Sequence, residues 1–280
     1  MHFIISKHII RIGAYAYTHK STQKGEDKMQ VIAIVNRKGG VGKTATAQAL
    51  GAGLQKKGYK VLFVDLDSQA NLSYALKADP AKPNSLDLLT EAVKPSEAVQ
   101  QTENGYIIAG SDRLARADAN IEDNAGKYYH LKEALEALKK SFDYVVIDTP
   151  AALDILTLNA LTAAHGVIIP VQADIYSLQG IDQLQQAVNT VKKYSNKDLK
   201  IKGVLITRYN SRANISKDMK DNLEDMAKAL NTKVYKTPIR ECTAIKEAQF
   251  TQQDIFTYAP KSNASADYIE FIKEFLKGEK

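Results

Sequence analysis

The segment KGGVGKT, residues 38–44, directly follows the apolar run 31–35 and opens a stretch of helical composition. A strand, a glycine-rich turn and a helix in this order are the setting in which a phosphate-binding P-loop occurs. Gly39, Gly40 and Gly42 carry no side chain, so backbone N–H groups can point at phosphate oxygens. The positive end of the helix dipole favours the same negative charge. The segment therefore predicts a βα unit whose turn binds a nucleotide.

The polar end of this turn carries the residues that triphosphate chemistry needs. Lys43 is placed to neutralise the β- and γ-phosphates, and the Thr44 hydroxyl suits Mg²⁺, a hard cation that prefers oxygen ligands. Val41 and Ala45 complete the predicted nucleotide-binding stretch. The strict Walker A pattern has glycine where this chain has Arg37. A glycine-rich turn that caps an ordinary helix is the alternative, but it gives no reason for the Lys-Thr pair.

Acidic residues end two further apolar runs. VVIDTP places Asp148 at a strand end, which is typical of a Walker B carboxylate that binds the Mg²⁺ shell through water. VLFVDLD places Asp65 and Asp67 at another strand end, where one of them can orient the attacking water. The alternative for each acid is a cap on the helix or loop that follows.

The apolar runs also predict the fold class. They are short and do not alternate with polar residues, which suits strands buried on both faces of a parallel sheet. Leu131, Leu135 and Leu138, and likewise Leu184, Val188 and Val191, have helical spacing between such runs. We therefore expect a doubly wound α/β fold with a mostly parallel sheet flanked by helices. Residues 78–104 are expected to form a looping excursion with one or two short helices. The expected strands are 31–35, 61–64, 106–109, 144–147, 167–171, 203–206 and 233–235.

Length and charge bound the organisation of the chain. Its 280 residues, 44% hydrophobic and 25% charged, predict one domain over residues 29–280. Residues 1–28 are expected to be a disordered leader or to precede the true start at Met29. The single cysteine, Cys242, excludes an intrachain disulfide and fits a reducing cytoplasm. The net charge of +6 favours polyanionic partners such as nucleic acid or an anionic membrane surface.

The chain resembles the deviant Walker A family of ParA and MinD, because Lys38 precedes the two glycines that lead to the P-loop lysine. VDLDSQANLS, DTPAALDILTLNAL and PVQADIYSLQGIDQL are similar to ParA motifs, and the likeness runs from about Met29 to the end. The resemblance implies an ATP sandwich dimer in which Lys38 reaches the partner's phosphates and Gly40 allows closure. It also implies that Asp67 is the hydrolytic acid, that Asp65 lies beside the metal and that Asp148 is the Walker B residue.

The resemblance further implies nucleotide-base and DNA contacts. Arg208 and Pro238 lie in segments that flank the base in relatives. TRYNSR matches a DNA-contacting region of the family, and the predicted DNA contacts are Arg212, Lys217, Lys220, Arg240 and Lys246. The family's IPRNVRLSEAP reads IRECTAIKEAQ here, so Arg240 is shifted by one position and a second arginine is missing. Ser68 and Ala70 replace the family's usual proline and glycine. An ordinary solvated face is the alternative for these cations.

The expected function is a slow ATP-driven switch in the cytoplasm, associated with the nucleoid. ATP and Mg²⁺ join two protomers, the dimer holds DNA without sequence preference, and a ParB-type partner accelerates hydrolysis. A MinD-like or protein-cluster-positioning ATPase is an alternative, although ADYIEFIKEFLKGEK lacks the basic face of a membrane helix, so no membrane contact is expected. A metabolic ligase such as dethiobiotin synthetase is the alternative from another class, with substrate-stimulated turnover that is indifferent to DNA.

Overall fold

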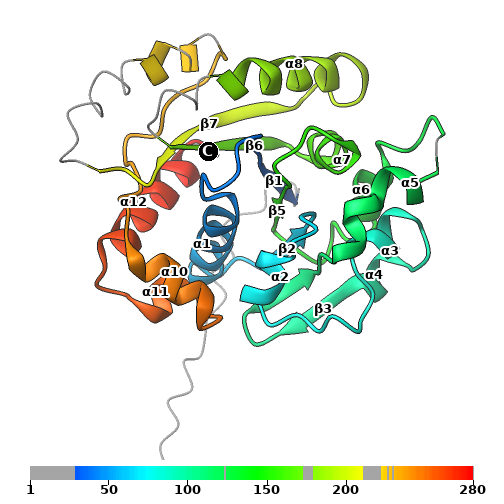
Figure 1. Ribbon diagram of the computed structural model, residues 1–280, viewed down its shortest axis with the longest axis horizontal. Coiled ribbons are helices and arrows are strands. Elements are labelled where there is room, and N and C mark those ends of the chain that lie inside the picture. Colours follow the sequence, from blue (N-terminus) through cyan, green and yellow to red (C-terminus); the bar gives the residue numbers. More distant parts are fainter. Residues whose placement is uncertain are drawn as a thin grey trace, which may run out of the picture.

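The computed structural model describes residues 29–122, 124–172, 179–210, 222–225, 227, 228 and 230–279. Seven strands form one sheet in the order β3-β4-β2-β5-β1-β6-β7 (Figure 1). All neighbouring strands are parallel except β3 and β4, which are antiparallel. This confirms the predicted fold class. The strands are β1 (Gln30–Ile34), β2 (Val61–Asp65), β3 (Val99–Thr102), β4 (Gly105–Ile108), β5 (Tyr144–Asp148), β6 (Gly166–Gln172) and β7 (Lys200–Thr207).

Helices cover both faces of the sheet, and the sequence of β1 shows why. Val31 and Ala33 pack into one buried cluster while Ile32 and Ile34 pack into the other, since successive side chains of a strand point to opposite faces. The first cluster is covered by α3 (Ser85–Leu89), α4 (Pro95–Ala98), η1 (Asp112–Arg116), α5 (Ala117–Asn120), α6 (His130–Ala137), α7 (Ile155–Ala163) and α8 (Gln179–Tyr194). The second is covered by α1 (Lys43–Lys56), α2 (Asn71–Ala75), α10 (Thr243–Phe250), α11 (Ile255–Tyr258) and α12 (Asn263–Lys277).

Two expectations about the ends of the sheet were wrong. Residues 233–235 do not form a strand, because they contribute only one isolated parallel bridge, from Val234 to Val204. Residues 78–104 contain the expected short helices but also β3, an edge strand made of Val99, Gln100, Gln101 and Thr102. Its polar composition suits an edge strand, which has one neighbour only, and hides it from a search for apolar runs.

The strand order brings the predicted site together. β5 lies between β1 and β2, so the last residue of β5, Asp148, pairs in register with Ile34 on one side and with Asp65 on the other. α1 begins just beyond the end of β1, at Lys43. The P-loop and both acidic strand ends therefore meet at the carboxyl edge of the central strands, where open α/β sheets bind ligands.

The last helix, α12, packs against the core. Tyr268, Phe271, Ile272 and Phe275 are buried in the second cluster. Among the described residues, no helix is both long and apolar enough to cross a membrane.

Gly51 provides a test of how tightly α1 packs on the sheet. A Cβ atom at this position would overlap the ring of Phe63 on β2. We predict that Gly51→Ala lowers the free energy of unfolding by about 1–3 kcal/mol, because overpacking of a rigid buried ring outweighs the gain in helix propensity. Urea denaturation measures the change. In the Phe63→Leu background, the same substitution is expected to cost less, and equal costs in both backgrounds would contradict this packing argument.

Candidate nucleotide-binding site

The P-loop has the backbone conformation that its glycines predict. Gly40 and Gly42 have φ angles of 74° and 84°, in the left-handed region that residues with a Cβ atom adopt at a cost. Gly42 is the N-cap of α1, and its carbonyl accepts the Thr46 N–H at 2.9 Å. The turn therefore leads straight into the helix whose positive end faces the predicted phosphate position.

Neighbouring strand ends hold the P-loop in place. The Thr207 hydroxyl at the end of β7 donates to the Val41 carbonyl at 2.7 Å, and it also lies 3.1 Å from the Val171 carbonyl on β6. Asn36 Nδ2 donates to the Pro170 carbonyl at 2.7 Å, while Asn36 Oδ1 accepts the Lys38 N–H at 2.9 Å. These supporting residues were not predicted from the sequence, since a threonine or asparagine at the end of an apolar run has no distinctive pattern.

The Lys43 side chain is buried at the centre of the site. Its Nζ donates to the Lys38 carbonyl at 3.3 Å. Burial lowers the pKa of Lys43, and the nearby carboxylates of Asp148 and Asp67 oppose that shift. A buried ammonium between two acids and a glycine-rich turn is suited to binding a polyanion.

Asp148 is fully buried, and neither of its carboxylate oxygens has a hydrogen-bond partner among the described residues. Burial raises the pKa of Asp148 well above its ordinary value, and the charge of Asp65 raises it further. The Thr44 hydroxyl and Lys43 lie close enough to counteract that rise, although the approach of Thr44 falls short of hydrogen-bond geometry. Two unpaired carboxylate oxygens beside a threonine hydroxyl fit a hydrated Mg²⁺ ion.

Asp65 has its oxygens occupied by the protein. Its Oδ2 accepts the Ser73 N–H at 2.8 Å and the Ser73 hydroxyl at 2.7 Å, and its Oδ1 accepts the Asp67 N–H at 3.1 Å. Burial raises the pKa of Asp65 to about 6, even though the hydrogen bonds from Ser73 lower it. Asp65 therefore fixes the loop that carries Asp67. The predicted position beside the metal stays a prediction.

The loop after β2 carries Asp67 to the cavity. Asp67 Oδ1 accepts the Gln69 N–H at 3.0 Å, and the Asp67 carbonyl accepts the Ala70 N–H at 2.9 Å. Ala70, which stands where the family has glycine, has a φ of 50°. The departure from the family therefore falls on a left-handed position, and the alanine there restricts the alternative conformations of the loop.

The candidate site is a cavity of about 770 Å³. Gly39, Gly40, Lys43, Thr44 and Asp67 line one part of it, with other P-loop residues. The rest of it is lined by Arg208 and Tyr268, by residues 239–242 and by part of α10. Arg208 lines the cavity, whereas Pro238 does not and its neighbour Ile239 does. Contact of Arg208 and Pro238 with the nucleotide base stays a prediction.

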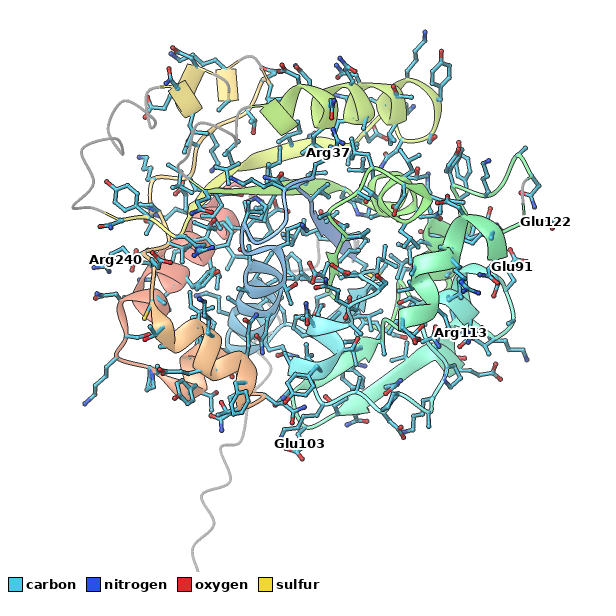
Figure 2. The ribbon with its side chains drawn as sticks, in the orientation of Figure 1. Arg37, Glu91, Glu103, Arg113, Glu122 and Arg240 are labelled. Atoms are coloured by element: carbon cyan, nitrogen blue, oxygen red, sulfur yellow. The ribbon has the colours of Figure 1, made fainter. Side chains whose placement is uncertain are left out.

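The predicted DNA contacts fall in two groups. Arg212, Lys217 and Lys220 lie outside the described residues. Lys246 lines the rim of the nucleotide cavity. Arg240 lines the same cavity on the side of α12, where Asp267 binds its guanidinium (Figure 2).

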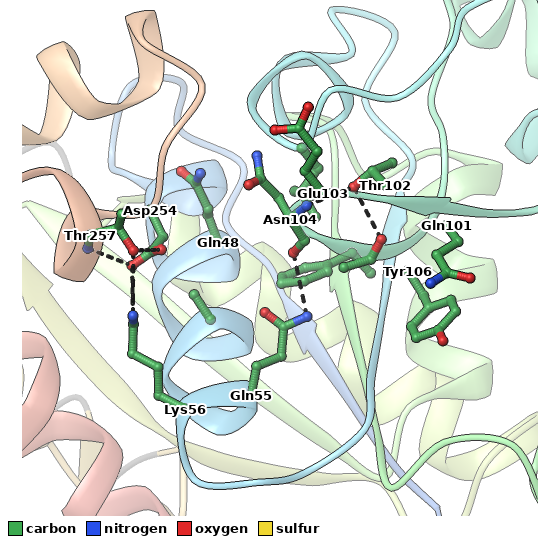
Figure 3. A pocket seen from close by; sticks show the side chains of 14 residues that line it. Gln48, Gln55, Lys56, Gln101, Thr102, Glu103, Asn104, Tyr106, Asp254 and Thr257 are labelled. Carbon is green, nitrogen blue, oxygen red and sulfur yellow. Dashed lines mark hydrogen bonds and ion pairs between the residues drawn. The ribbon is translucent and has the colours of Figure 1, made fainter. Parts of the chain in front are cut away.

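A second cavity of about 550 Å³ lies between α1, the β3–β4 turn and α11 (Figure 3). Its polar groups largely bind one another. Gln55 Nε2 donates to the Asn104 carbonyl at 3.4 Å, and Lys56 Nζ donates to the Thr257 hydroxyl at 3.4 Å. This arrangement offers no buried, unpaired charge comparable to Asp148, so the cavity at the P-loop is the candidate site.

Comparisons with known proteins agree with this geometry. A family model described as an AAA domain matches residues 29–201. The sporulation initiation inhibitor protein Soj of Bacillus subtilis (strain 168) is 38% identical over 249 residues, covering 88% of this chain and 97% of Soj. The chromosome partitioning protein ParA of Myxococcus xanthus is 32% identical over 274 residues, covering 96% of this chain and 95% of that protein.

A solved structure shows the same similarity. The crystal structure described as cobyrinic acid a,c-diamide synthase of Mycobacterium smegmatis, with bound ADP and magnesium, has a TM-score of 0.76 and 35% identity. The match covers 89% of this chain and 94% of that chain. The family model includes the P-loop and both acidic strand ends, and it stops before the cavity wall formed by Arg208 and residues 239–242.

The raised carboxyl pKa values generate a prediction about pH. The pKa of Asp65 is raised to about 6, and that of Asp148 is raised well above its ordinary value. Both groups therefore take up protons in the folded protein at a pH at which they are ionised in the unfolded chain. Their penalty is therefore present at high pH and is relieved as pH falls through the folded pKa values. We predict that Asp148→Asn increases the free energy of unfolding at pH 8 by about 1–3 kcal/mol without nucleotide and Mg²⁺.

Thermal or urea unfolding between pH 8 and pH 5.5 measures this effect. The difference between wild type and Asp148→Asn is expected to shrink as the pH falls. Asp118→Asn, at an exposed position on α5, is the control and is expected to change stability little. An Asp148→Asn protein that is less stable than wild type at pH 8 would contradict the prediction.

Proposed function

Since this chain belongs to the ParA family of partitioning ATPases, we propose that it is an ATP-driven switch that binds DNA as a dimer. The observation that carries the proposal is the buried, unpaired carboxylate of Asp148 beside Lys43 and Thr44, behind a glycine-rich loop that begins with Lys38. Such a site requires a cation and a polyanion to balance its charges.

ATP with Mg²⁺ is the ligand that fits these residues. The backbone of Gly39, Gly40 and Gly42 would bind phosphate oxygens, and Lys43 would neutralise the terminal phosphates. Thr44 and Asp148 would hold the metal, directly or through its water shell. When bound, Mg²⁺ neutralises the charge that develops on the phosphates during transfer. ADP and magnesium in the similar Mycobacterium smegmatis structure support this assignment.

Asp67 is proposed to orient the water that attacks the terminal phosphate. It lines the cavity, and its charge acts on Lys43. Its loop is anchored by Asp65 and Ser73, so its carboxylate has a defined place at the end of β2. A carboxylate within reach of the attacking water is the group that this step requires. We expect hydrolysis to be slow until a partner stimulates it, as the family resemblance implies.

The outer side of the P-loop is open to a second protomer. A Cβ atom added to Gly39 or Gly40 would meet no atom within 4 Å among the described residues. Both glycines are exposed, next to Lys38. A second copy could therefore approach closely enough for Lys38 to act on the partner's nucleotide, as the family resemblance implies.

The proposed polyanionic partner is DNA of any sequence. Arg212, Lys217, Lys220 and Lys246 are its proposed contacts, and phosphate binding by such cations needs no base readout. Arg240 also stays a prediction, although its guanidinium already binds Asp267. A ParB-type protein is the proposed stimulator of hydrolysis. Association with the nucleoid would follow from DNA binding.

A metabolic ligase is the second candidate, because a structure with 35% identity is described as a diamide synthase. The two candidates differ in what stimulates ATP turnover. A partition switch responds to DNA and to its partner protein, whereas a ligase responds to a small carboxylic acid and ignores DNA. The same assay with and without DNA separates them.

ATP-dependent DNA binding is the first test. We predict that the protein binds an arbitrary DNA duplex with ATP and Mg²⁺, and much less with ADP or without nucleotide. Affinity should fall steeply with salt, since phosphate contacts release counterions. Arg212→Glu is expected to weaken binding, whereas Arg116→Glu on η1, away from the cavity, makes the same charge change with little effect. Fluorescence anisotropy across a salt series measures this, and DNA binding that ignores the nucleotide would contradict the switch.

The hydrolytic role of Asp67 is the second test. We predict that Asp67→Asn lowers kcat for ATP hydrolysis by about 10²–10⁴-fold, because the carboxylate that orients water is lost. ATP binding should change only a few-fold, and the ATP-dependent DNA complex should last longer. Asp118→Asn is the matched control. Phosphate release and DNA dissociation are the measurements, and unchanged phosphate release in Asp67→Asn would remove Asp67 from the mechanism.

A further inference from the structure

Arg240 and Asp267 form a three-bond clamp at the edge of the nucleotide cavity. Arg240 Nε donates to Asp267 Oδ2 at 2.9 Å, an Arg240 terminal NH₂ nitrogen donates to Oδ1 at 2.6 Å, and the Arg240 backbone N–H donates to Oδ2 at 3.0 Å. The Asp267 side chain is only 8% exposed, whereas that of Arg240 is 42% exposed. The geometry uses the fork of an arginine, which lysine does not reproduce.

The clamp fixes a segment that lines the nucleotide cavity. Residues 239–242 line the cavity next to Arg208. On one side this segment is bound to the strand end of β7, where the Ile239 N–H donates to the Ile206 carbonyl at 2.8 Å and the Tyr209 N–H donates to the Ile239 carbonyl at 2.9 Å. On the other side, Asp267 of α12 holds it. The position of this wall thus depends on α12 as well as on the end of β7.

The same helix also contacts the phosphate side of the cavity. Tyr268, next to Asp267, places its hydroxyl 3.5 Å from the Thr46 hydroxyl on α1. Tyr268 is buried and lines the cavity too. Adjacent residues of α12 therefore hold both walls, the P-loop helix through Tyr268 and residues 239–242 through Asp267.

Removing either member of the clamp has a clear physical cost. Without Arg240, a carboxylate that is 8% exposed loses two charge-assisted hydrogen bonds. The neighbouring pair, Arg208 and Glu241, cannot replace the clamp, since both side chains are exposed and such pairs contribute little. Residues 239–242 would then be held only by their backbone bonds to Ile206 and Tyr209, without the link to α12.

We propose that the Arg240–Asp267 clamp is a positioning device for the nucleotide base, which sets the distance between the base wall and the phosphate loop. The inference rests on the proposed nucleotide site and adds a specificity determinant to it. In this role Arg240, at the position where this chain departs from the family motif, acts on the nucleotide through the clamp. The role is an alternative to the DNA contact predicted for Arg240. Phosphate recognition by the P-loop is independent of the clamp.

The test compares ATP with inorganic tripolyphosphate, which has the phosphates but no base. In the presence of Mg²⁺, Asp267→Asn and Arg240→Lys are expected to raise the Kd for ATP about tenfold, while the Kd for tripolyphosphate stays within about twofold. The KM for ATP should rise while kcat at saturating ATP stays close to wild type, since the hydrolytic residues are untouched. Isothermal titration and steady-state kinetics on the full chain give these values.

Glu274→Gln is the matched control. Glu274 lies on the same helix and holds the chain just before the wall, through Lys233 Nζ at 3.4 Å and the Lys236 N–H at 2.9 Å. It does not line the cavity, so its substitution is expected to leave both Kd values unchanged. If Asp267→Asn fails to fold, Arg240→Lys alone carries the test.

The outcomes separate the clamp from the proposed function. Variants that bind ATP as tightly as wild type would overturn the clamp, and so would equal weakening of ATP and tripolyphosphate. A wild type that binds neither compound would overturn the nucleotide site itself. If Asp267→Asn strengthens DNA binding at saturating ATP without changing the Kd for ATP, Arg240 is a DNA contact and the inference is wrong.

Discussion

Two buried carboxylates on neighbouring strands set the conditions for the rest of this molecule. Asp65 and Asp148 occupy paired register positions at the ends of β2 and β5, both without exposure to solvent. Two negative charges that lie close together and away from water are unfavourable unless a cation balances them. Lys43 supplies one positive charge from α1. A ligand that brings a metal ion would therefore stabilise this arrangement. The buried negative charge that Lys43 alone does not balance identifies the site better than the shape of the cavity does.

The two acids meet this constraint differently, and the difference separates their roles. Asp65 accepts hydrogen bonds from Ser73 and from the Asp67 N–H, and these bonds hold the loop that follows β2. Asp148 makes no such bonds among the described residues. One carboxylate thus organises the loop of the proposed hydrolytic acid while the other is available to a metal shell.

The sequence predicted the parts of this site that depend on local geometry. The glycine turn, Lys43 and the acid-bearing strand ends follow from short motifs, and the parallel sheet follows from continuous apolar runs. The polar edge strand β3 escaped, because an edge strand needs no apolar run. The clamp of Arg240 and Asp267 escaped for another reason. Its members are 27 residues apart, and only tertiary packing of α12 against the cavity wall makes them partners.

The clamp lies where this chain departs from the family motif. The wall of residues 239–242 departs from the family motif, and its arginine is displaced by one position. An arginine at the new position needs a different residue to accept its hydrogen bonds. Asp267 does so from α12, a helix that also contacts α1. In the proposed clamp, Arg240 and Asp267 fix this segment to α12, in addition to its backbone bonds to Ile206 and Tyr209. An arginine that gives two side-chain hydrogen bonds to a carboxylate of its own chain has fewer donors left for a DNA phosphate. Resemblance to a DNA-contacting segment therefore does not by itself assign DNA contact to each arginine within it.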